Sequence, residues 1–123
     1  MTNVVAAIIK KNNQFLIVQR NKNKHLGLKW EFPGGKVQES ETFEKALLRE
    51  IKEELNITII IHEKIAEEKY KDHKIDIVLH YYLCSHESGK MKLSEHEAFA
   101  WVEKKDFDKY DFAEGDGNII SLL

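Results

Sequence analysis

The chain of 123 residues has little of what several protein classes require. Its single cysteine, Cys84, rules out an intramolecular disulfide and agrees with a reducing cytoplasm. Cys84 ends an apolar run, so we expect a small buried hydrophobe and not a nucleophile. No apolar segment approaches the roughly 18 residues of a membrane-spanning helix, and no charged-then-apolar leader opens the chain. These absences predict a cytoplasmic protein without a membrane partner.

The charge balance argues against a nucleic acid polymer as a partner. The formal net charge is −2 although 33% of the residues are charged, so bulk electrostatics would not draw the chain to a nucleic acid polymer. Any phosphate binding must therefore come from a local site. With 42% hydrophobic residues, the chain can form one core, and we expect a single domain over residues 1–123.

Hydrophobic periodicity predicts one long helix among several strands. The helix is expected at Thr42–Leu55, where apolar residues recur every four positions. Asn3–Lys10 is typical of a buried strand and should form a hairpin with Phe15–Arg20. The remaining expected elements are a polar loop at Asn21–Lys29, strands at Trp30–Phe32, Ile57–Glu67, Lys74–Leu83 and Phe99–Val102, a helical turn at Lys104–Lys109 and a closing helix at Asp116–Leu123. Unequal groups of strands around two helices predict an α/β domain with a mixed sheet.

The last turns of the long helix carry a concentration of acidic residues. At about 100° of rotation per residue, Glu50 and Glu54 project into the arc that also carries Phe43, Ile51 and Leu55. Carboxylates on a core-facing arc are costly unless a counter-charge meets them, and the helix dipole is unfavourable to anions at this end. No lysine is spaced to supply enough charge from within, so we expect a cation from outside the helix.

Glu50, Glu53 and Glu54 stand at positions i, i+3 and i+4, which brings their carboxylates onto adjoining turns. Magnesium usually takes one or two carboxylates together with water and substrate phosphate, and it would polarise a phosphoryl group and lower the pKa of a bound water. Carboxylates alone do not separate Mg²⁺ from Mn²⁺. The alternative is a solvated helix with chance spacing, which explains neither the inward carboxylates nor the preceding glycines.

The segment from Gly35 to Ile57 resembles the signature of the Nudix hydrolases. That signature reads Gly, five residues, Glu, seven residues, Arg-Glu-apolar-any-Glu-Glu-any-Gly-apolar, and it is far more specific than a short glycine motif. The chain matches eight of its nine specified positions: Gly35, Glu41, Arg49, Glu50, Ile51, Glu53, Glu54 and Ile57. Asn56 replaces the family's glycine at the expected helix end, where asparagine is the next-best residue for a left-handed backbone.

The resemblance implies a fold and a metal site. The fold would be an α/β/α sandwich with a mixed β-sheet between helices, covering essentially the whole chain. The metal ligands would be the backbone carbonyl of Gly34 and the carboxylates of Glu50, Glu53 and Glu54. Mg²⁺ is the expected ion, with Mn²⁺ as an alternative.

The resemblance also implies catalytic roles. Arg49 is spaced to pair with Glu53 and would support it, and Glu50 would act beside them. The general base would be Glu53, or a glutamate in a loop before a late strand, for which Glu95 and Glu97 are the candidates. The alternative for that loop is a solvated segment.

The segment Trp30–Lys36 resembles the MutT branch of the family, which cleaves nucleoside triphosphates to a monophosphate and pyrophosphate. The substrate-binding residues that this resemblance implies are Arg20, His25, Glu31, Phe32, Pro33 and Gly34. The planar guanidinium group of arginine can bind a phosphate through two hydrogen bonds, which favours a substrate-binding role for Arg20. The alternatives are a surface strand end for Arg20, an exposed loop for His25 and plain core for Phe32.

Tyr110–Asp116 resembles a segment whose last residue reads the edge of the base. An ionised Asp116 would accept hydrogen bonds from an amino or imino proton, which guanine derivatives and cytosine both present. The alternative is an N-cap for the closing helix, and both roles are compatible.

Together these features predict a Mg-dependent nucleoside triphosphate pyrophosphohydrolase, working as a monomer or homodimer. It would remove modified nucleotides such as 8-oxo-dGTP, or act on CTP and 5-methyl-dCTP-like substrates. The alternatives are a broad nucleotide diphosphate hydrolase and a non-catalytic nucleotide sensor. The complete set of Glu50, Glu53 and Glu54 argues against the sensor.

Overall fold

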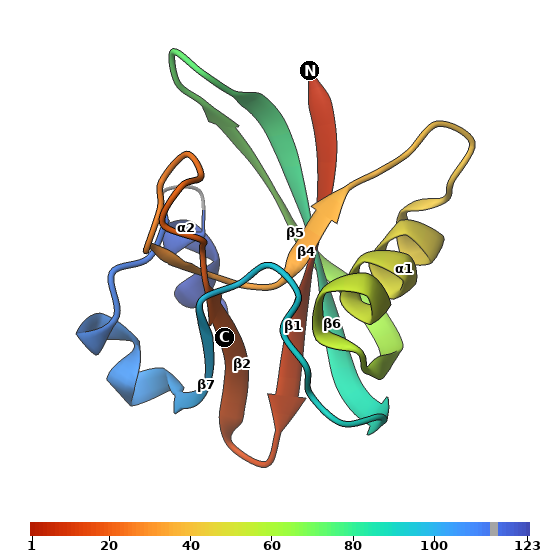
Figure 1. Ribbon diagram of the computed structural model, residues 1–123, viewed down its shortest axis with the longest axis vertical. Coiled ribbons are helices and arrows are strands. Elements are labelled where there is room, and N and C mark those ends of the chain that lie inside the picture. Colours follow the sequence, from red (N-terminus) through yellow and green to blue (C-terminus); the bar gives the residue numbers. More distant parts are fainter. Residues whose placement is uncertain (114–115) are drawn as a thin grey trace.

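A computed structural model describes residues 1–113 and 116–123 of the chain (Figure 1). Glu114 and Gly115, within the segment Tyr110–Asp116, lie outside the described residues. The strands are β1 (Thr2–Lys11), β2 (Gln14–Gln19), β3 (Trp30–Glu31), β4 (Gly34–Lys36), β5 (Thr58–Lys71), β6 (Asp76–Ser88) and β7 (Ala98–Glu103). The helices are α1 (Phe43–Leu55), the 3₁₀-helix η1 (Lys104–Lys109) and α2 (Gly117–Ile120).

The strands in the described part of the chain form one mixed, seven-stranded sheet. The main path runs in the order β3-β2-β1-β6-β5, with β4 paired to β1 and β7 paired to β2. β1 and β6 are parallel and the other pairs are antiparallel. The predicted hairpin of β1 and β2 is confirmed, and Asn12 turns it in a left-handed conformation (φ 56°).

The two strands of this hairpin separate soon after the turn. β2 pairs with β1 only at Lys10 and Lys11, whereas β4 pairs with β1 over Val4–Ala6. Figure 1 shows β1 and β2 diverging from the hairpin, with β4 crossing β1 about midway along that strand. Val5 of β1 and Arg20, which follows β2, both line one cleft, so the two diverging strands contribute to the same cavity.

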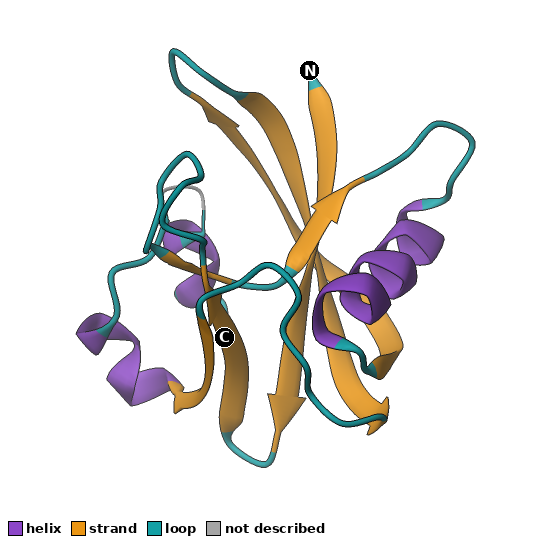
Figure 2. Ribbon diagram, viewed as in Figure 1, coloured by secondary structure: helices purple, strands orange, loops and turns teal. Residues whose placement is uncertain are grey.

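Alternating side chains of β1 divide the core into two layers. Val5, Ala7 and Ile9 pack in the same cluster as the buried face of α1, while Ala6 and Ile8 pack in a second cluster. That second cluster contains residues of η1 and α2, which lie across the sheet from α1 (Figure 2). This arrangement confirms the predicted α/β/α sandwich.

Helix α1 begins and ends at capping residues that its sequence supplies. The side chain of Thr42 accepts a hydrogen bond from the Lys45 N–H at 3.1 Å. At the other end Asn56 is left-handed (φ 60°), and its N–H donates to the Lys52 carbonyl. Asparagine therefore fulfils the conformational role of the glycine in the family signature.

Several element bounds differ from the prediction. β5 runs beyond the predicted Glu67 to Lys71, which pairs with Asp76. β6 begins at Asp76, two residues later than predicted, but runs beyond Leu83 to Ser88, because its backbone pairing with β5 continues to Thr58. Asp72 stabilises the turn between the two strands by accepting hydrogen bonds from the N–H groups of Lys74 and Ile75. The closing helix is shorter than predicted and ends at Ile120.

The expectation for Cys84 is confirmed. Its side chain is buried in the cluster below α1, and burial raises the pKa of the thiol to about 12, so it is not a ready nucleophile. Among the described residues no helix combines the length and the apolar character needed to cross a membrane.

Candidate active site

A cleft of about 560 Å³ lies where the sheet opens, and it extends from the end of α1 to the segment around Asp116. The residues of the predicted sites that line it are Arg20, His25, Glu31, Phe32, Gly34, Glu50, Glu53, Glu54 and Asp116. Arg20 and Asp116, which are 96 positions apart in the chain, therefore line the same cavity. Three candidate site residues named in the sequence analysis are not part of the lining: Pro33, Arg49 and the candidate base Glu97. Pro33 is buried with its carbonyl bonded to the Ala7 N–H at 2.8 Å, and Arg49 lies behind the carboxylates.

Close approach of the chain explains both glycines beside α1. A β-carbon on Gly35 would lie 2.3 Å from the carboxyl carbon of Glu50, and one on Gly34 would lie 1.9 Å from the Val5 carbonyl oxygen. Gly34 thus permits the pairing of β4 with β1, and Gly35 leaves room for the Glu50 carboxylate. The glycines place backbone oxygens and a helix carboxylate at the same end of the cleft.

Glu54 carries the strongest sign of a missing positive charge. Its Oε2 atom is buried and has no hydrogen-bond partner among the residues that the structure describes. Burial, followed by the negative charges of Glu50, Glu31 and Glu95, raises the pKa of the Glu54 carboxyl to about 9. A buried carboxylate without a partner is costly, and a divalent cation at this position would offset that cost.

Arg49 forms ion pairs with several carboxylates at the acidic end of the cleft. Its Nη1 atom lies 2.8 Å from Glu50 Oε1 and 3.2 Å from Glu53 Oε2, which confirms the predicted pairing with Glu53. Arg49 makes shorter contacts with Glu41, whose Oε2 accepts a hydrogen bond from Nε at 2.7 Å and whose Oε1 accepts one from Nη2 at 2.9 Å. These bonds hold the pKa of Glu41 at about 2. Arg49 thus links the loop before α1 to the acidic turns at its end.

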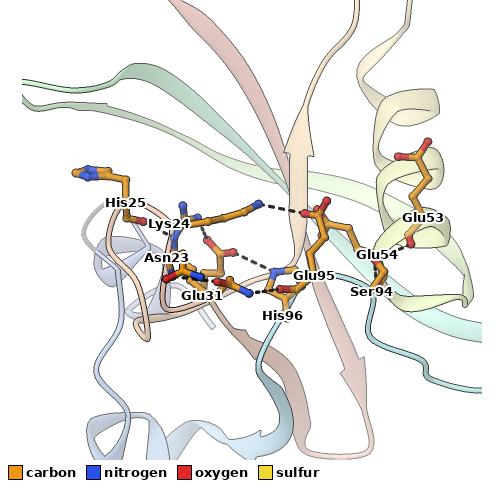
Figure 3. A network of polar contacts seen from close by, with 11 residues as sticks. Asn23, Lys24, His25, Glu31, Glu53, Glu54, Ser94, Glu95 and His96 are labelled. Atoms are coloured by element: carbon orange, nitrogen blue, oxygen red, sulfur yellow. Dashed lines mark hydrogen bonds and ion pairs between the residues drawn. The ribbon is translucent and has the colours of Figure 1, made fainter.

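Glu53 is the most exposed of the three helix carboxylates, with 60% of its side chain accessible. Figure 3 shows it directed away from Glu95 and His96. Within residues 1–113 and 116–123, no three acidic, histidine or cysteine side chains form a group ready to hold an ion. The donors near the cleft are nevertheless carboxylate and backbone oxygens, which suit a hard divalent cation. The residues fit such an ion if the Glu53 side chain turns toward Glu54.

A chain of polar contacts lines the other side of the cleft (Figure 3). Arg20 donates from Nη1 to Glu31 Oε1 at 2.8 Å and from Nε to the His25 carbonyl at 2.8 Å. The second oxygen of Glu31 lies 3.2 Å from His96 Nε2. Arg20 is therefore not a free strand end, and its contacts fix Glu31 inside the cleft.

His96 is a residue of this site that the sequence analysis missed. Only 7% of its side chain is exposed, although its neighbours Glu95 and Glu97 are exposed. The sequence carried no signal for it, because a histidine between two glutamates in a loop is typical of a solvated segment. Its contact with Glu31 joins residues 65 positions apart.

The loop before β7 is hydrogen-bonded both to the end of α1 and to the end of β2. Ser94 donates from its N–H to the Glu54 carbonyl at 3.1 Å, and the Glu97 N–H donates to the Gln19 carbonyl at 3.0 Å. Glu95 lines the cleft and pairs with Lys24 at 3.1 Å. Both glutamates are exposed, but this anchored loop is not the freely solvated segment of the alternative interpretation.

His25 lines the cleft, but its ring pairs with a residue that the sequence analysis did not place in the site. Its Nε2 atom lies 2.9 Å from Asp72 Oδ2 in the turn between β5 and β6. In Figure 3 its ring lies apart from the group formed by Glu31 and His96. The structure brings its backbone carbonyl, rather than its ring, to Arg20.

Asp116 is buried at the back of the cleft. Its Oδ2 accepts a hydrogen bond from the Phe32 N–H at 3.1 Å, and its Oδ1 accepts one from the Tyr81 hydroxyl. Burial raises the pKa of this carboxyl to about 7, against the opposing effect of the Tyr81 hydrogen bond. The N-cap alternative is wrong for the side chain, since the carboxyl makes no capping bond to the described part of α2.

Phe32 is a core residue that also borders the cleft. It is 3% exposed and contacts the rings of Tyr81, Phe107 and Phe112, so it belongs to the core. It also lines the cleft beside Asp116. An aromatic wall next to a polar group suits a nucleobase.

Comparison with known proteins agrees with this geometry. The chain is 34% identical over 116 residues to a CTP pyrophosphohydrolase of Escherichia coli (strain K12), covering 94% of this chain and 86% of that protein. It is 33% identical over 122 residues to an 8-oxo-dGTP diphosphatase of Buchnera aphidicola subsp. Schizaphis graminum, covering 99% and 92% of the two chains. The crystal structure of a MutT NUDIX hydrolase from Burkholderia pseudomallei superposes with a TM-score of 0.91 at 25% identity, covering 99% and 97%. The model of the NUDIX domain matches residues 1–123, and the chain therefore belongs to the Nudix family of hydrolases.

Proposed function

We propose that this hydrolase converts nucleoside triphosphates to nucleoside monophosphates and pyrophosphate, and that it removes modified nucleotides from the nucleotide pool. The observation that carries the proposal is the continuity of the cleft. The acidic end of α1, with the buried Glu54, and an aromatic pocket with Phe32 and Asp116 share one cavity. The names of two relatives, an 8-oxo-dGTP diphosphatase and a CTP pyrophosphohydrolase, support substrates of this class.

The acidic end would hold a divalent metal ion. The proposed ligands are the carbonyl of Gly34 and the carboxylates of Glu50, Glu53 and Glu54, with Mg²⁺ as the favoured ion and Mn²⁺ as the alternative. When bound, the ion would neutralise phosphate charge and activate water. Arg49 would keep Glu50 and Glu53 oriented, because it contacts both carboxylates.

The reaction requires a base and a leaving group. We propose that Glu53 accepts a proton from the attacking water, because it is accessible from the cleft and held by Arg49. The oxygen of that water forms a bond to phosphorus, and the bond to the oxygen bridging the α- and β-phosphates breaks. The products are then a monophosphate and pyrophosphate. Lys24, paired with Glu95 at the cleft, is available to meet the phosphates.

The nucleoside would occupy the opposite end of the cleft. Phe32 would form a wall for the base, Glu31 and Arg20 would contact the nucleotide, and Asp116 would meet the base edge. These groups are held before any ligand arrives, because Arg20 and His96 fix Glu31 and two donors fix Asp116. Such preorganisation lowers the cost of binding.

We further propose that the chain acts as a single domain in the cytoplasm, as a monomer or homodimer. The unpaired, buried Cys84 is compatible with a reducing compartment. Size-exclusion chromatography with light scattering would decide between monomer and homodimer.

The test is pyrophosphate release in the presence of Mg²⁺ across the ordinary nucleotides, 8-oxo-dGTP and 5-methyl-dCTP. We expect one substrate to be favoured in kcat/KM by orders of magnitude, with loss of activity in Glu54→Gln. A flat profile would contradict the sanitising function and favour a broad diphosphate hydrolase. Nucleotide binding without turnover would favour a sensor.

A further inference from the structure

Tyr81 lies beneath the nucleoside end of the cleft, although no motif marks it. It sits near the middle of β6, is fully buried, and packs in the cluster on the side of the sheet away from α1. Its place in an alternating strand is typical of an ordinary core residue. Its hydroxyl, however, donates to Oδ1 of Asp116 at the back of the cleft.

The Asp116 carboxyl is held by two donors that come from separate elements. Tyr81 of β6 donates to Oδ1, and the backbone N–H of Phe32, which follows β3, donates to Oδ2 at 3.1 Å. Because each oxygen accepts a hydrogen bond from a different donor, the carboxyl group is held in one rotational orientation. Rotation about the bond to its β-carbon would break at least one of these bonds.

Tyr81 also contacts the aromatic wall of the same pocket. The rings of Tyr81 and Phe32 are 6.5 Å apart at an interplanar angle of 89°, which is an edge-to-face contact. One tyrosine therefore contacts both the ring that would stack on a base and the carboxyl that would meet its edge.

The remaining hydrogen-bonding capacity of Asp116 is consequently directional. Each carboxyl oxygen has two lone-pair sites, and within the described part of the chain one site on each accepts a hydrogen bond. The other lone-pair sites of the two oxygens lie in the plane of the carboxyl group. A base whose N–H groups point at these sites is bound well. A base with a different edge leaves buried polar groups without hydrogen bonds.

We propose that Tyr81 is a positioning residue for base selection, which acts by holding the Asp116 carboxyl in the one orientation that matches the preferred base. This inference rests on the proposed function. Removing the Tyr81 hydroxyl would free Oδ1 and let the carboxyl rotate to suit other bases. We expect the phosphate end of the cleft to be unaffected, because Glu50 and Glu54 belong to α1, whose buried face packs in the other layer of the core from Tyr81.

The variant that tests this is Tyr81→Phe, and Tyr82→Phe is the matched control. Tyr82 is the next residue of β6 and is also buried, but it packs in the cluster on the α1 side of the sheet. KM and kcat are measured with Mg²⁺ for the preferred triphosphate and for the three ordinary triphosphates with other bases. We expect Tyr81→Phe to reduce the selectivity ratio about tenfold or more through KM, with kcat nearly unchanged, and Tyr82→Phe to preserve the ratio.

An unchanged selectivity ratio in folded Tyr81→Phe, or an equal loss in Tyr82→Phe, would overturn the inference and leave the proposed function standing. A wild-type enzyme without base preference would overturn both. In an Asp116→Ala background, Tyr81→Phe should have no further effect on selectivity, since Tyr81 acts through that carboxyl.

A measurement on the wild-type protein covers the case in which Tyr81→Phe does not fold. With the tyrosine ring carbons labelled at the hydroxyl-bearing position, the preferred nucleoside monophosphate is added and the NMR signals are followed. The Tyr81 signal should shift while the Tyr82 signal stays in place. A bound nucleotide that leaves the Tyr81 signal unmoved would refute the positioning role.

Discussion

The carboxylate of Glu50 occupies the space that a β-carbon on residue 35 would need: the carboxyl carbon and such a β-carbon would be only 2.3 Å apart. At Gly34 the obstacle is backbone, since the Val5 carbonyl oxygen would be 1.9 Å away. The two neighbouring glycines therefore have different physical roles. Gly34 serves the pairing of β4 with β1, and Gly35 serves the position of one acidic side chain.

Gly35→Ala should consequently reduce activity without unfolding the protein. The Glu50 side chain can rotate away from the new methyl group, which preserves the fold but displaces the carboxylate. A displacement of about 1 Å at a reacting centre can cost about 100-fold in rate. We expect a loss of that order in kcat/KM together with a nearly unchanged melting temperature.

Gly34→Ala provides the contrast, because a clash with the Val5 backbone cannot be relieved by a side-chain rotation. It should lower the melting temperature markedly. Full activity in Gly35→Ala would show that Glu50 need not occupy its present position.

Glu54→Gln should abolish turnover while preserving the fold. The amide has nearly the same size as the carboxyl but cannot supply the negative charge that a divalent cation requires. We expect a rate loss beyond the roughly 10–100-fold that removal of an outer-shell partner of a metal costs. The rise in melting temperature that Mg²⁺ should cause in the wild type is expected to disappear, since stabilisation by a ligand depends on its affinity.

The control for this variant is Glu44→Gln, which removes an exposed carboxylate from the first turn of the same helix. It should leave both activity and the Mg²⁺ response unchanged. Wild-type activity in Glu54→Gln at saturating Mg²⁺ would reject the metal role of Glu54.

Glu53 and Glu95 can be distinguished as general bases by their response to the metal concentration. A general base contributes about 10²–10⁴-fold to a rate, and excess Mg²⁺ does not replace it. We expect Glu53→Gln to lose activity in this range even at saturating Mg²⁺. Glu95→Gln should lose less than tenfold, because Glu95 lies outside the group of helix carboxylates that Arg49 holds together. The reverse order of losses would identify Glu95 as the base.

The sequence predicted the acidic end of the cleft better than the nucleoside end. The residues from Gly35 to Ile57 are close in the chain, so helical geometry alone places Glu50 and Glu54 together. The same reasoning predicted the left-handed Asn56 and the pair of Arg49 with Glu53, both of which are confirmed.

The nucleoside end depends on contacts between distant segments. His96 reaches Glu31 across 65 positions, and Tyr81 reaches Asp116 across 35. No local pattern marks such partners, because each residue is typical of its own loop or strand. For His25 a local pattern was present, since its spacing matched the family. Its ring, however, pairs with Asp72 in the turn between β5 and β6, and that contact also joins distant segments of the chain.

Asp116 also predicts a pH dependence of stability. Burial raises the pKa of its carboxyl in the folded state from 3.8 to about 7. Between these values the folded chain holds a proton that the unfolded chain has released, so the free energy of unfolding falls as the pH rises. The slope is at most about 1.4 kcal/mol per pH unit for one group, and it vanishes below pH 3.8 and above about 7. Asp116→Asn should remove this contribution.

The measurement is urea unfolding of both proteins at several pH values between 4 and 8. Glu54, whose pKa is also raised, contributes a slope of the same sign to both proteins and cancels in the difference. We expect Asp116→Asn to gain stability relative to the wild type as the pH rises through this window. Asp111→Asn is the control, because the Asp111 side chain is 72% exposed. A stability difference between Asp116→Asn and the wild type that is independent of pH would show that Asp116 is ionised throughout, and its carboxyl would then read the base only as an acceptor.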